Sequence, residues 1–98
     1  MKQLDLTPEQ IEFRDLLLEN IYQSYPDDWK TWTIDEKVRN RCGNISPPFS
    51  KFFGLTIASG FCNDQPHFWC KDSEGNIIDP TREQFGPGPY EYEENAHD

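Results

Sequence analysis

The chain has 98 residues and a net charge of −9, from 18 acidic and 9 basic side chains. This length fits one small domain with a thin core. The excess of acidic side chains argues against binding to nucleic acid and against adsorption to an anionic membrane, because both depend on clustered cations. The negative charge is compatible with a soluble protein or with one that binds a cationic partner. The aromatic content of 14% indicates a folded chain, since disordered acidic chains are poor in aromatic residues.

The cysteine count and the absence of long apolar runs indicate a cytoplasmic protein. No apolar run is long enough to span a membrane, and the N-terminus lacks the apolar core of a secretory signal. The odd set Cys42, Cys62 and Cys70 indicates free thiols in a reducing compartment. A zinc site from these thiols and His67 would need an unusual spacing, because no Cys-x-x-Cys pair occurs. We therefore expect no metal and no cofactor.

The N-terminal half is predicted to be helical. Apolar residues recur at helical spacing over residues 7–25, with Thr7 as the N-cap of a capping box. Asp35 is the expected N-cap of a short helix that turns Val38 inward. Ser46 is the expected N-cap of another short helix that ends before a glycine.

The C-terminal half changes to short apolar stretches between turn residues, which is typical of strands. Strands are predicted over residues 55–61, 67–71 and 76–79, and the last two form a hairpin. Helices followed by strands favour an α+β fold, with N-terminal helices packed on a small antiparallel sheet. We expect one domain over residues 1–90 and an acidic, flexible tail over residues 91–98.

The turn of the predicted hairpin determines which side chains meet. Asp72 and Gly75 occupy the positions that a type I turn with a left-handed glycine requires. This loop pairs Asp72 with Asn76, and counting outward places His67 and Asp79 on one face as diagonal neighbours. A two-residue loop would place these two side chains on opposite faces.

Cys42 is the candidate nucleophile for this histidine and carboxylate. Several cations shortly before it favour the thiolate: Lys37, Arg39 and Arg41. In a Cys-His-Asp site the histidine takes the thiol proton and the aspartate fixes its tautomer. Each residue also has a purely structural interpretation, with Cys42 buried, His67 in a strand and Asp79 in a turn.

The stretch from His67 to Phe85 carries a recognisable pattern. It reads His-Phe-Trp, a D-x-x-G turn, Ile-Ile-Asp-Pro-Thr and Gln-Phe. The pattern resembles that of small bacterial and phage proteins whose Cys-His-Asp order is similar to the papain-like and transglutaminase-like cysteine hydrolases. The resemblance covers about residues 39–90, with Cys42 at the nucleophile position and Gly60 at the glycine before the histidine strand. It implies a minimal version of that architecture.

The chain departs from the larger fold at the helix that carries the cysteine. Pro47 and Pro48 follow Cys42 closely, and a proline inside a helix costs about 3 kcal/mol. The helix is therefore expected to begin at Ser46, which leaves Cys42 in an irregular turn.

Gln84 and Trp69 are candidate supporting residues. The amide of Gln84 would either donate to an oxyanion or fix the turn after Asp79, and Trp69 would form a wall of the site on the face of His67.

Two functions remain open at this point. The first is a cysteine-dependent amide enzyme (a peptidase, amidase, deamidase or acyl transferase) with a protein or peptide substrate. In it Cys42 attacks, His67 serves as base and then acid, and Asp79 orients the imidazole. The second is a non-catalytic acidic binding or inhibitor protein of phage or mobile-element type, which engages a cationic host protein through its negative surface.

Overall fold

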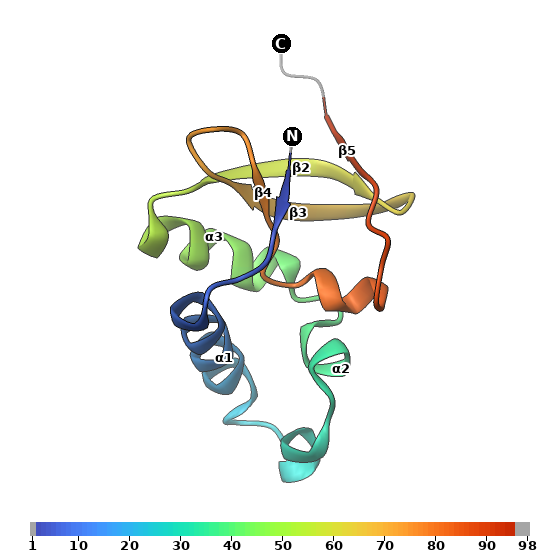
Figure 1. The fold of residues 1–98 in the computed structure, drawn as a ribbon. Coiled ribbons are helices and arrows are strands. Elements are labelled where there is room, and N and C mark those ends of the chain that lie inside the picture. Colours follow the sequence, from blue (N-terminus) through green and yellow to red (C-terminus); the bar gives the residue numbers. More distant parts are fainter. Residues whose placement is uncertain (1, 96–98) are drawn as a thin grey trace.

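The computed structural model describes residues 2–95, and its fold is α+β. A layer of helices lies on one side of a five-stranded sheet (Figure 1). The helices are α1 (Pro8–Tyr22), α2 (Ile34–Val38) and α3 (Cys42–Phe53), with 3-10 turns η1 (Asp27–Thr31) and η2 (Arg82–Phe85). The strands are β1 (Gln3–Leu4), β2 (Thr56–Cys62), β3 (Gln65–Lys71), β4 (Ile77–Ile78) and β5 (Tyr92–Glu94). Within residues 2–95 no helix has the length and apolar character to cross a membrane.

The first helix begins as predicted. The Thr7 side chain accepts a hydrogen bond from the Gln10 backbone, and the Gln10 side chain accepts one from the Thr7 backbone. The prediction of Asp35 as the next N-cap was wrong. Thr33 caps α2, because its extended backbone presents its N–H to the Glu36 carboxylate at 2.9 Å. Val38 is fully buried, as expected.

The third helix begins earlier than predicted. It starts at Cys42 and runs through Pro47 and Pro48, whereas the prediction began at Ser46. The two proline rings remove the N–H groups that would bond to carbonyls one turn earlier. Packing offsets this cost, since Ile45 and Phe49 on either side of the prolines are fully buried in the core. Cys42 therefore occupies the first turn of a regular helix.

The predicted hairpin register is confirmed. Cys70 lies opposite Ile78, and the Asp72 N–H donates to the Asn76 carbonyl at 3.1 Å, which pairs these two residues. Gly75 has a φ of +81°, the left-handed conformation that the loop requires. The sheet as a whole is mixed and not wholly antiparallel, because β1 pairs with β4 in parallel.

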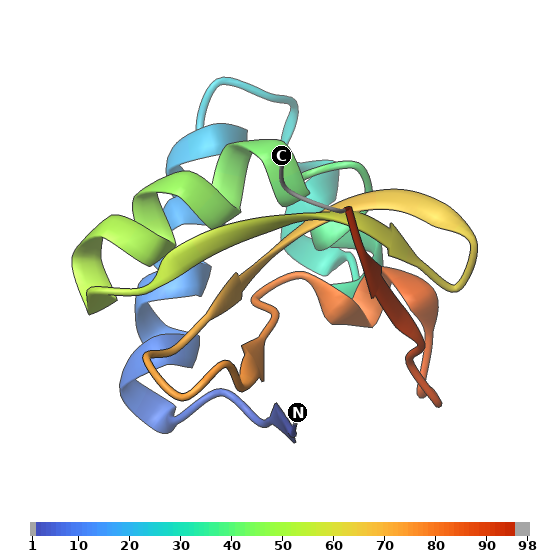
Figure 2. The same cartoon turned by 90° about the horizontal axis from the view of Figure 1, so that it is seen from above.

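Part of the expected acidic tail belongs to the sheet. Strand β5 pairs with the C-terminal end of β2, at the edge opposite β1 (Figure 2). Residues 96–98 lie outside the described residues. The two strands approach closely at Gly60, where a Cβ atom would lie 2.9 Å from the Asn95 nitrogen and would overlap the Glu93 carbonyl oxygen. Glycine at this position therefore brings β5, and with it Tyr92, onto the sheet.

Both faces of β3 carry buried side chains. Cys70 packs in the main core with Ile45, Phe49 and other residues of the helices. Trp69, on the opposite face, packs with Ala58, Ile77 and Tyr92. His67 is two residues before Trp69 and so shares its face.

Candidate active site

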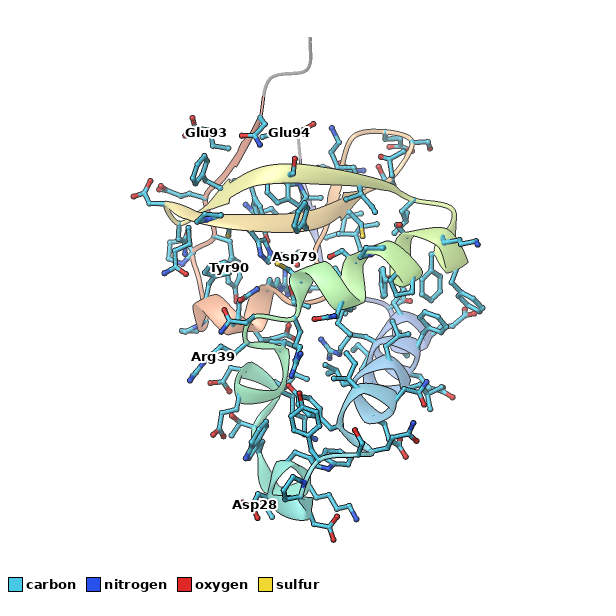
Figure 3. All side chains as sticks on the ribbon, turned by 180° about the vertical axis from the view of Figure 1, so that it is seen from behind. Asp28, Arg39, Asp79, Tyr90, Glu93 and Glu94 are labelled. Carbon is cyan, nitrogen blue, oxygen red and sulfur yellow. The ribbon has the colours of Figure 1, made fainter. Side chains whose placement is uncertain are left out.

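His67 and Asp79 form a buried pair. The Nε2 atom of His67 lies 2.7 Å from Oδ2 of Asp79, and their side chains are each only 1% exposed. The hairpin register accounts for this contact, because it places Asp79 opposite Trp69 and diagonal to His67. Figure 3 shows Asp79 inside the molecule, between the sheet and the helices. The sequence-predicted pairing of these two side chains is thus present in the structure.

The Asp79 carboxylate is held by further donors. The Tyr92 hydroxyl donates to Oδ2 at 2.8 Å, and the Thr81 backbone N–H donates to Oδ1 at 3.0 Å. The Thr81 hydroxyl lies 3.4 Å from the same Oδ1. Both oxygens are therefore hydrogen-bonded, and buried carboxylates need such partners to remain charged. These bonds fix Asp79 in the orientation in which it accepts a hydrogen bond from His67.

Cys42 reaches the histidine from the first turn of α3. Strand β4 pairs with β3 only at Cys70 and Lys71. The first turns of α3 lie beside the backbone of Phe68, farther along β3. The Ser46 hydroxyl lies 3.5 Å from the Phe68 carbonyl oxygen, and the Phe68 backbone N–H is near enough to the Cys42 sulfur to lower the pKa of the thiol. The thiol lies close enough to the His67 ring for each group to shift the pKa of the other. Nε2 of His67 is committed to Asp79, so Nδ1 is the nitrogen left for Cys42, and the Gln84 amide nitrogen lies 3.2 Å from the same atom.

The pKa values of the two reacting groups move toward an ion pair. Burial raises the pKa of Cys42, but the hydrogen bonds from His67 and from the Phe68 backbone outweigh it, so the net pKa is lowered. Burial lowers the pKa of His67, but the hydrogen bonds to Asp79 and Cys42 outweigh it and raise the pKa to about 9. Both shifts therefore move the two groups toward a thiolate beside an imidazolium.

The other two cysteines are enclosed inside the molecule. Cys62 and Cys70 are fully buried and free, and burial raises the pKa of each thiol to about 12. They are therefore protonated at neutral pH and act as small core residues. Within residues 2–95 no group of at least three His, Cys, Asp or Glu side chains is arranged to hold a metal ion.

Gln84 and Trp69 both lie beside the histidine ring. The Gln84 amide nitrogen lies 3.2 Å from Nδ1 of His67, and its amide oxygen accepts from the Asn40 backbone at 3.4 Å. The Trp69 ring stacks on His67 with a centroid distance of 6.0 Å. These two side chains restrict rotation of the imidazole.

Several residues of the site were missed in the sequence. Phe85 packs its ring edge-on against His67 at 4.8 Å, and Thr81 and Tyr92 hold Asp79. A signal existed for Thr81, because an aspartate often accepts from the backbone N–H two residues later in a turn. Tyr92 carried no such signal, since the acidic composition around it placed it in a tail.

A surface cavity gives access to the thiol. It has a volume of about 280 Å³, and its lining comprises Cys42, Ser59, Gly60, Pro66, His67, Phe68 and Asn95. Cys42 and His67 thus face the same cavity although Asp79 is enclosed behind the histidine. A carbonyl compound entering this cavity would meet the sulfur and the imidazole together.

Comparison with known proteins gives a family for the chain. A family model described as YunG protein matches residues 15–98, which include Cys42, His67 and Asp79. Searches of curated proteins and of solved structures gave no match. Because the matching model spans most of the sequence, the chain belongs to the YunG protein family.

Proposed function

We propose that the protein is a cysteine-dependent amide enzyme that acts on a protein or peptide substrate. The observation that carries this proposal is the continuous connection from the Cys42 thiol through the His67 ring to the Asp79 carboxylate. The lowered pKa of Cys42 and the raised pKa of His67 support it, because a nucleophilic thiolate and a proton donor are then present together.

The acylation step uses both partners of the ion pair. The Cys42 thiolate attacks the carbonyl carbon of the amide, a C–S bond forms, and the carbonyl π electrons move onto oxygen. When the tetrahedral intermediate collapses, the C–N bond breaks and Nδ1 of the His67 imidazolium gives its proton to the leaving nitrogen. The products are a free amine and a thioester on Cys42.

The helix N-terminus provides stabilisation for the oxyanion. Cys42 is the first residue of α3, and the first backbone N–H groups of a helix have no acceptor within the helix. The Cys42 N–H is therefore available to the oxyanion, and the positive end of the helix dipole favours both the thiolate and the oxyanion.

Release of the acyl group returns the site to its starting state. Water or an acceptor amine gives a proton to neutral His67 at Nδ1 and attacks the thioester carbonyl. The C–S bond breaks, and the thiolate leaves beside the re-formed imidazolium. Asp79 keeps the ring oriented through both halves of the cycle, because it accepts from Nε2 throughout.

This site supports two wider proposals. A cysteine at the start of a helix, a histidine on a strand of the sheet and an aspartate after the next strand are consistent with a minimal papain-like or transglutaminase-like architecture. The three free thiols suit a reducing compartment, so we place the enzyme in the cytoplasm.

The test is formation of an acyl-enzyme on Cys42. The protein is mixed with p-nitrophenyl acetate, and the acetylated residue is identified by peptide mass spectrometry. We expect rapid acetylation of Cys42 but not of Cys62 or Cys70, and a loss of at least about tenfold in rate in the His67→Gln variant. Absence of a Cys42 adduct, or an unchanged rate in His67→Gln, would overturn the proposal.

A second candidate function is binding of a cationic protein. At the end of the sheet, a cavity of about 250 Å³ is lined by Phe61, Asp64, Glu91, Tyr92 and Glu93. This combination of acidic and aromatic side chains suits a lysine or arginine side chain. A partner captured equally well by wild type and Cys42→Ala, and released by salt, would favour this function.

A further inference from the structure

The chain keeps cations without carboxylate partners directly before Cys42. They are Lys37, Arg39 and Arg41, and in the part of the chain from residue 2 to 95 none of them lies within 4.0 Å of a carboxylate oxygen. Acidic side chains outnumber basic ones by two to one in this protein, 18 to 9. A group of cations outside any salt bridge is therefore a local departure from the overall charge.

Two of these cations line a cavity. It has a volume of about 270 Å³, and its lining is Tyr22, Tyr25, Trp32, Glu36, Arg39, Asn40 and Arg41. The carboxylate of Glu36 is engaged by the backbone N–H and the hydroxyl of Thr33, each at 2.9 Å. The Glu36 carboxylate is thus held by the cap of α2 and interacts with Arg39 only at longer range, so the lining carries two cations against one carboxylate.

Arg41 is held in place by neutral groups. Its guanidinium donates to the Tyr22 hydroxyl at 3.1 Å and to the Tyr25 hydroxyl at 3.0 Å, and it lies 5.1 Å from the centroid of the Tyr22 ring. Phenol oxygens orient a guanidinium without cancelling its charge. Arg41 is therefore positioned while its positive charge remains available to an anion.

The cavity is adjacent to the candidate active site. Arg41 is the N-cap of α3, and Cys42 is the next residue. Asn40, in the lining, lies two residues before Cys42, so their Cα atoms are within about 7 Å. The Asn40 N–H donates to Gln84, whose amide nitrogen lies 3.2 Å from the His67 ring. The cavity and the imidazole thus share a contact through one side chain.

We propose that this cavity, here termed the anion pocket, binds a carboxylate of the substrate close to the amide bond that Cys42 attacks. The inference rests on the proposed function and names its substrate class, an amide or peptide with a carboxylate next to the reacting carbonyl. The negative charge of the rest of the protein repels anions. Selection of an acidic substrate therefore requires a local cationic site, and Arg39 and Arg41 provide it.

The test compares two alkylating reagents of similar size on the intact protein. Iodoacetate carries a carboxylate and iodoacetamide does not, and the rate of each at Cys42 is measured by peptide mass spectrometry. The ratio of the two rates corrects for any change in the thiolate fraction. We expect Arg39→Gln to lower the iodoacetate-to-iodoacetamide ratio by about threefold or more at low salt, and Arg39→Lys to retain most of it.

A matched control removes a cation elsewhere. Lys51 lies in the last turn of α3, the helix that begins at Cys42, and Lys51→Gln changes the net charge by the same amount as Arg39→Gln. We expect the ratio of Lys51→Gln to equal that of wild type. A similar fall in both variants would mean that the effect comes from overall charge, and no fall in Arg39→Gln would mean that the pocket does not act on anions. Either result would overturn the anion pocket.

Two further reagents identify the source of the carboxylate. N-iodoacetyl-glycine carries a C-terminal carboxylate, and N-iodoacetyl-glutamic acid α-amide carries an acidic side chain; each is compared with its neutral amide. An Arg39-dependent preference for either acid supports the anion pocket and names the group that it binds. Rapid alkylation of Cys42 without preference overturns the pocket but leaves the proposed function. Labelling of Cys42 no faster than that of Cys62 by every reagent overturns both.

Discussion

The His67 ring donates from Nε2 to the Asp79 carboxylate over 2.7 Å, and this contact leaves Nδ1 for Cys42 and for the Gln84 amide. The pair spans the hairpin diagonally, so it exists only in the register that the left-handed Gly75 permits. A slip of one residue would move Asp79 to the opposite face of the sheet. The turn therefore determines the tautomer of a histidine several residues away.

Replacement of Asp79 by asparagine tests the role of this contact. The Asp79→Asn variant keeps the shape of the side chain but removes the charge that raises the pKa of His67. With less imidazolium present the pKa of Cys42 rises, and the alkylation rate of Cys42 at neutral pH should fall by about tenfold or more. The rate is measured with iodoacetamide over a range of pH.

Asp64→Asn is the matched control for this variant. Asp64 is exposed in the turn between β2 and β3, and asparagine tolerates its positive φ of 65°. The substitution removes one negative charge without touching the site, so the alkylation profile should match that of wild type. An Asp79→Asn profile that also matched wild type would show that the carboxylate has no influence on the thiol.

The ion pair has a specific consequence for stability as a function of pH. The pKa of His67 rises from 6.5 to about 9 on folding, so its contribution is complete below pH 6.5 and is lost as the pH rises through 9. The pKa of Cys42 falls from 9.0, so its contribution is present above pH 9 and is lost as the pH falls through its lowered value. Where the two pH ranges overlap, below about pH 9, the opposite slopes offset each other in the wild type.

Removal of the thiol should expose the slope of the histidine alone. In Cys42→Ala the His67 pKa keeps the contribution of Asp79 but loses that of Cys42, so the stability should decrease as the pH rises above 6.5. Over the pH range in which the wild-type thiolate forms, the deficit relative to wild type should grow by up to about 1 kcal/mol per pH unit. Urea unfolding at several pH values measures this deficit. Cys62→Ala is the control: folding raises the pKa of Cys62 from 9.0 to about 12, so its deficit should be constant below about pH 8 and should shrink, not grow, above it. A constant deficit in Cys42→Ala would contradict the ion pair.

The sequence was sufficient for the parts of the site that depend on local chemistry. The capping box of Thr7, the loop closed by Gly75 and the pairing of His67 with Asp79 all follow from residues close in the chain. Each is determined by backbone geometry within a single element or turn. The α+β class followed in the same way from the order of the elements.

Tertiary packing decided the parts that the sequence did not predict. The helix α3 begins at Cys42 because burial of Ile45 and Phe49 outweighs the cost of two prolines. Helix propensities of single residues do not include the free energy of burial in the core. Tyr92 joins the site because β5 fits against Gly60, a contact between residues far apart in the chain. The acidic residues around Tyr92 conceal this role.

The hydroxyl of Tyr92 should contribute measurably to stability. Burial and the charge of Asp79 raise the pKa of Tyr92, so its hydroxyl remains a donor to the carboxylate. In Tyr92→Phe the Oδ2 atom loses one of its two partners, and a lost bond to a buried charge costs about 1–3 kcal/mol. Urea unfolding measures the loss. Tyr25→Phe, at a tyrosine that is 44% exposed, should cost much less; equal losses would argue against a special role for the Tyr92 hydroxyl.

Gly60 should be intolerant of any side chain, although its backbone φ is unremarkable. An alanine Cβ at this position would overlap the Glu93 carbonyl oxygen and lie 2.9 Å from the Cα of Glu94, so β5 would have to move away from β2. We expect Gly60→Ala to lose about 1–3 kcal/mol of stability, to exchange the amide hydrogens of β5 faster and to slow alkylation of Cys42, because Tyr92 would leave Asp79.

Gly43→Ala provides the comparison for Gly60→Ala. Gly43 lies in the first turn of α3, and a Cβ atom there would have no heavy atom within 4 Å. Alanine should therefore be tolerated and should stabilise the helix by about 0.5–1 kcal/mol. Thermal unfolding measures the stability of the two variants, and hydrogen exchange at β5 shows whether this strand has loosened in either of them. If Gly60→Ala kept the exchange rates of wild type in β5, the close approach of β5 to β2 would not be what positions Tyr92 against Asp79.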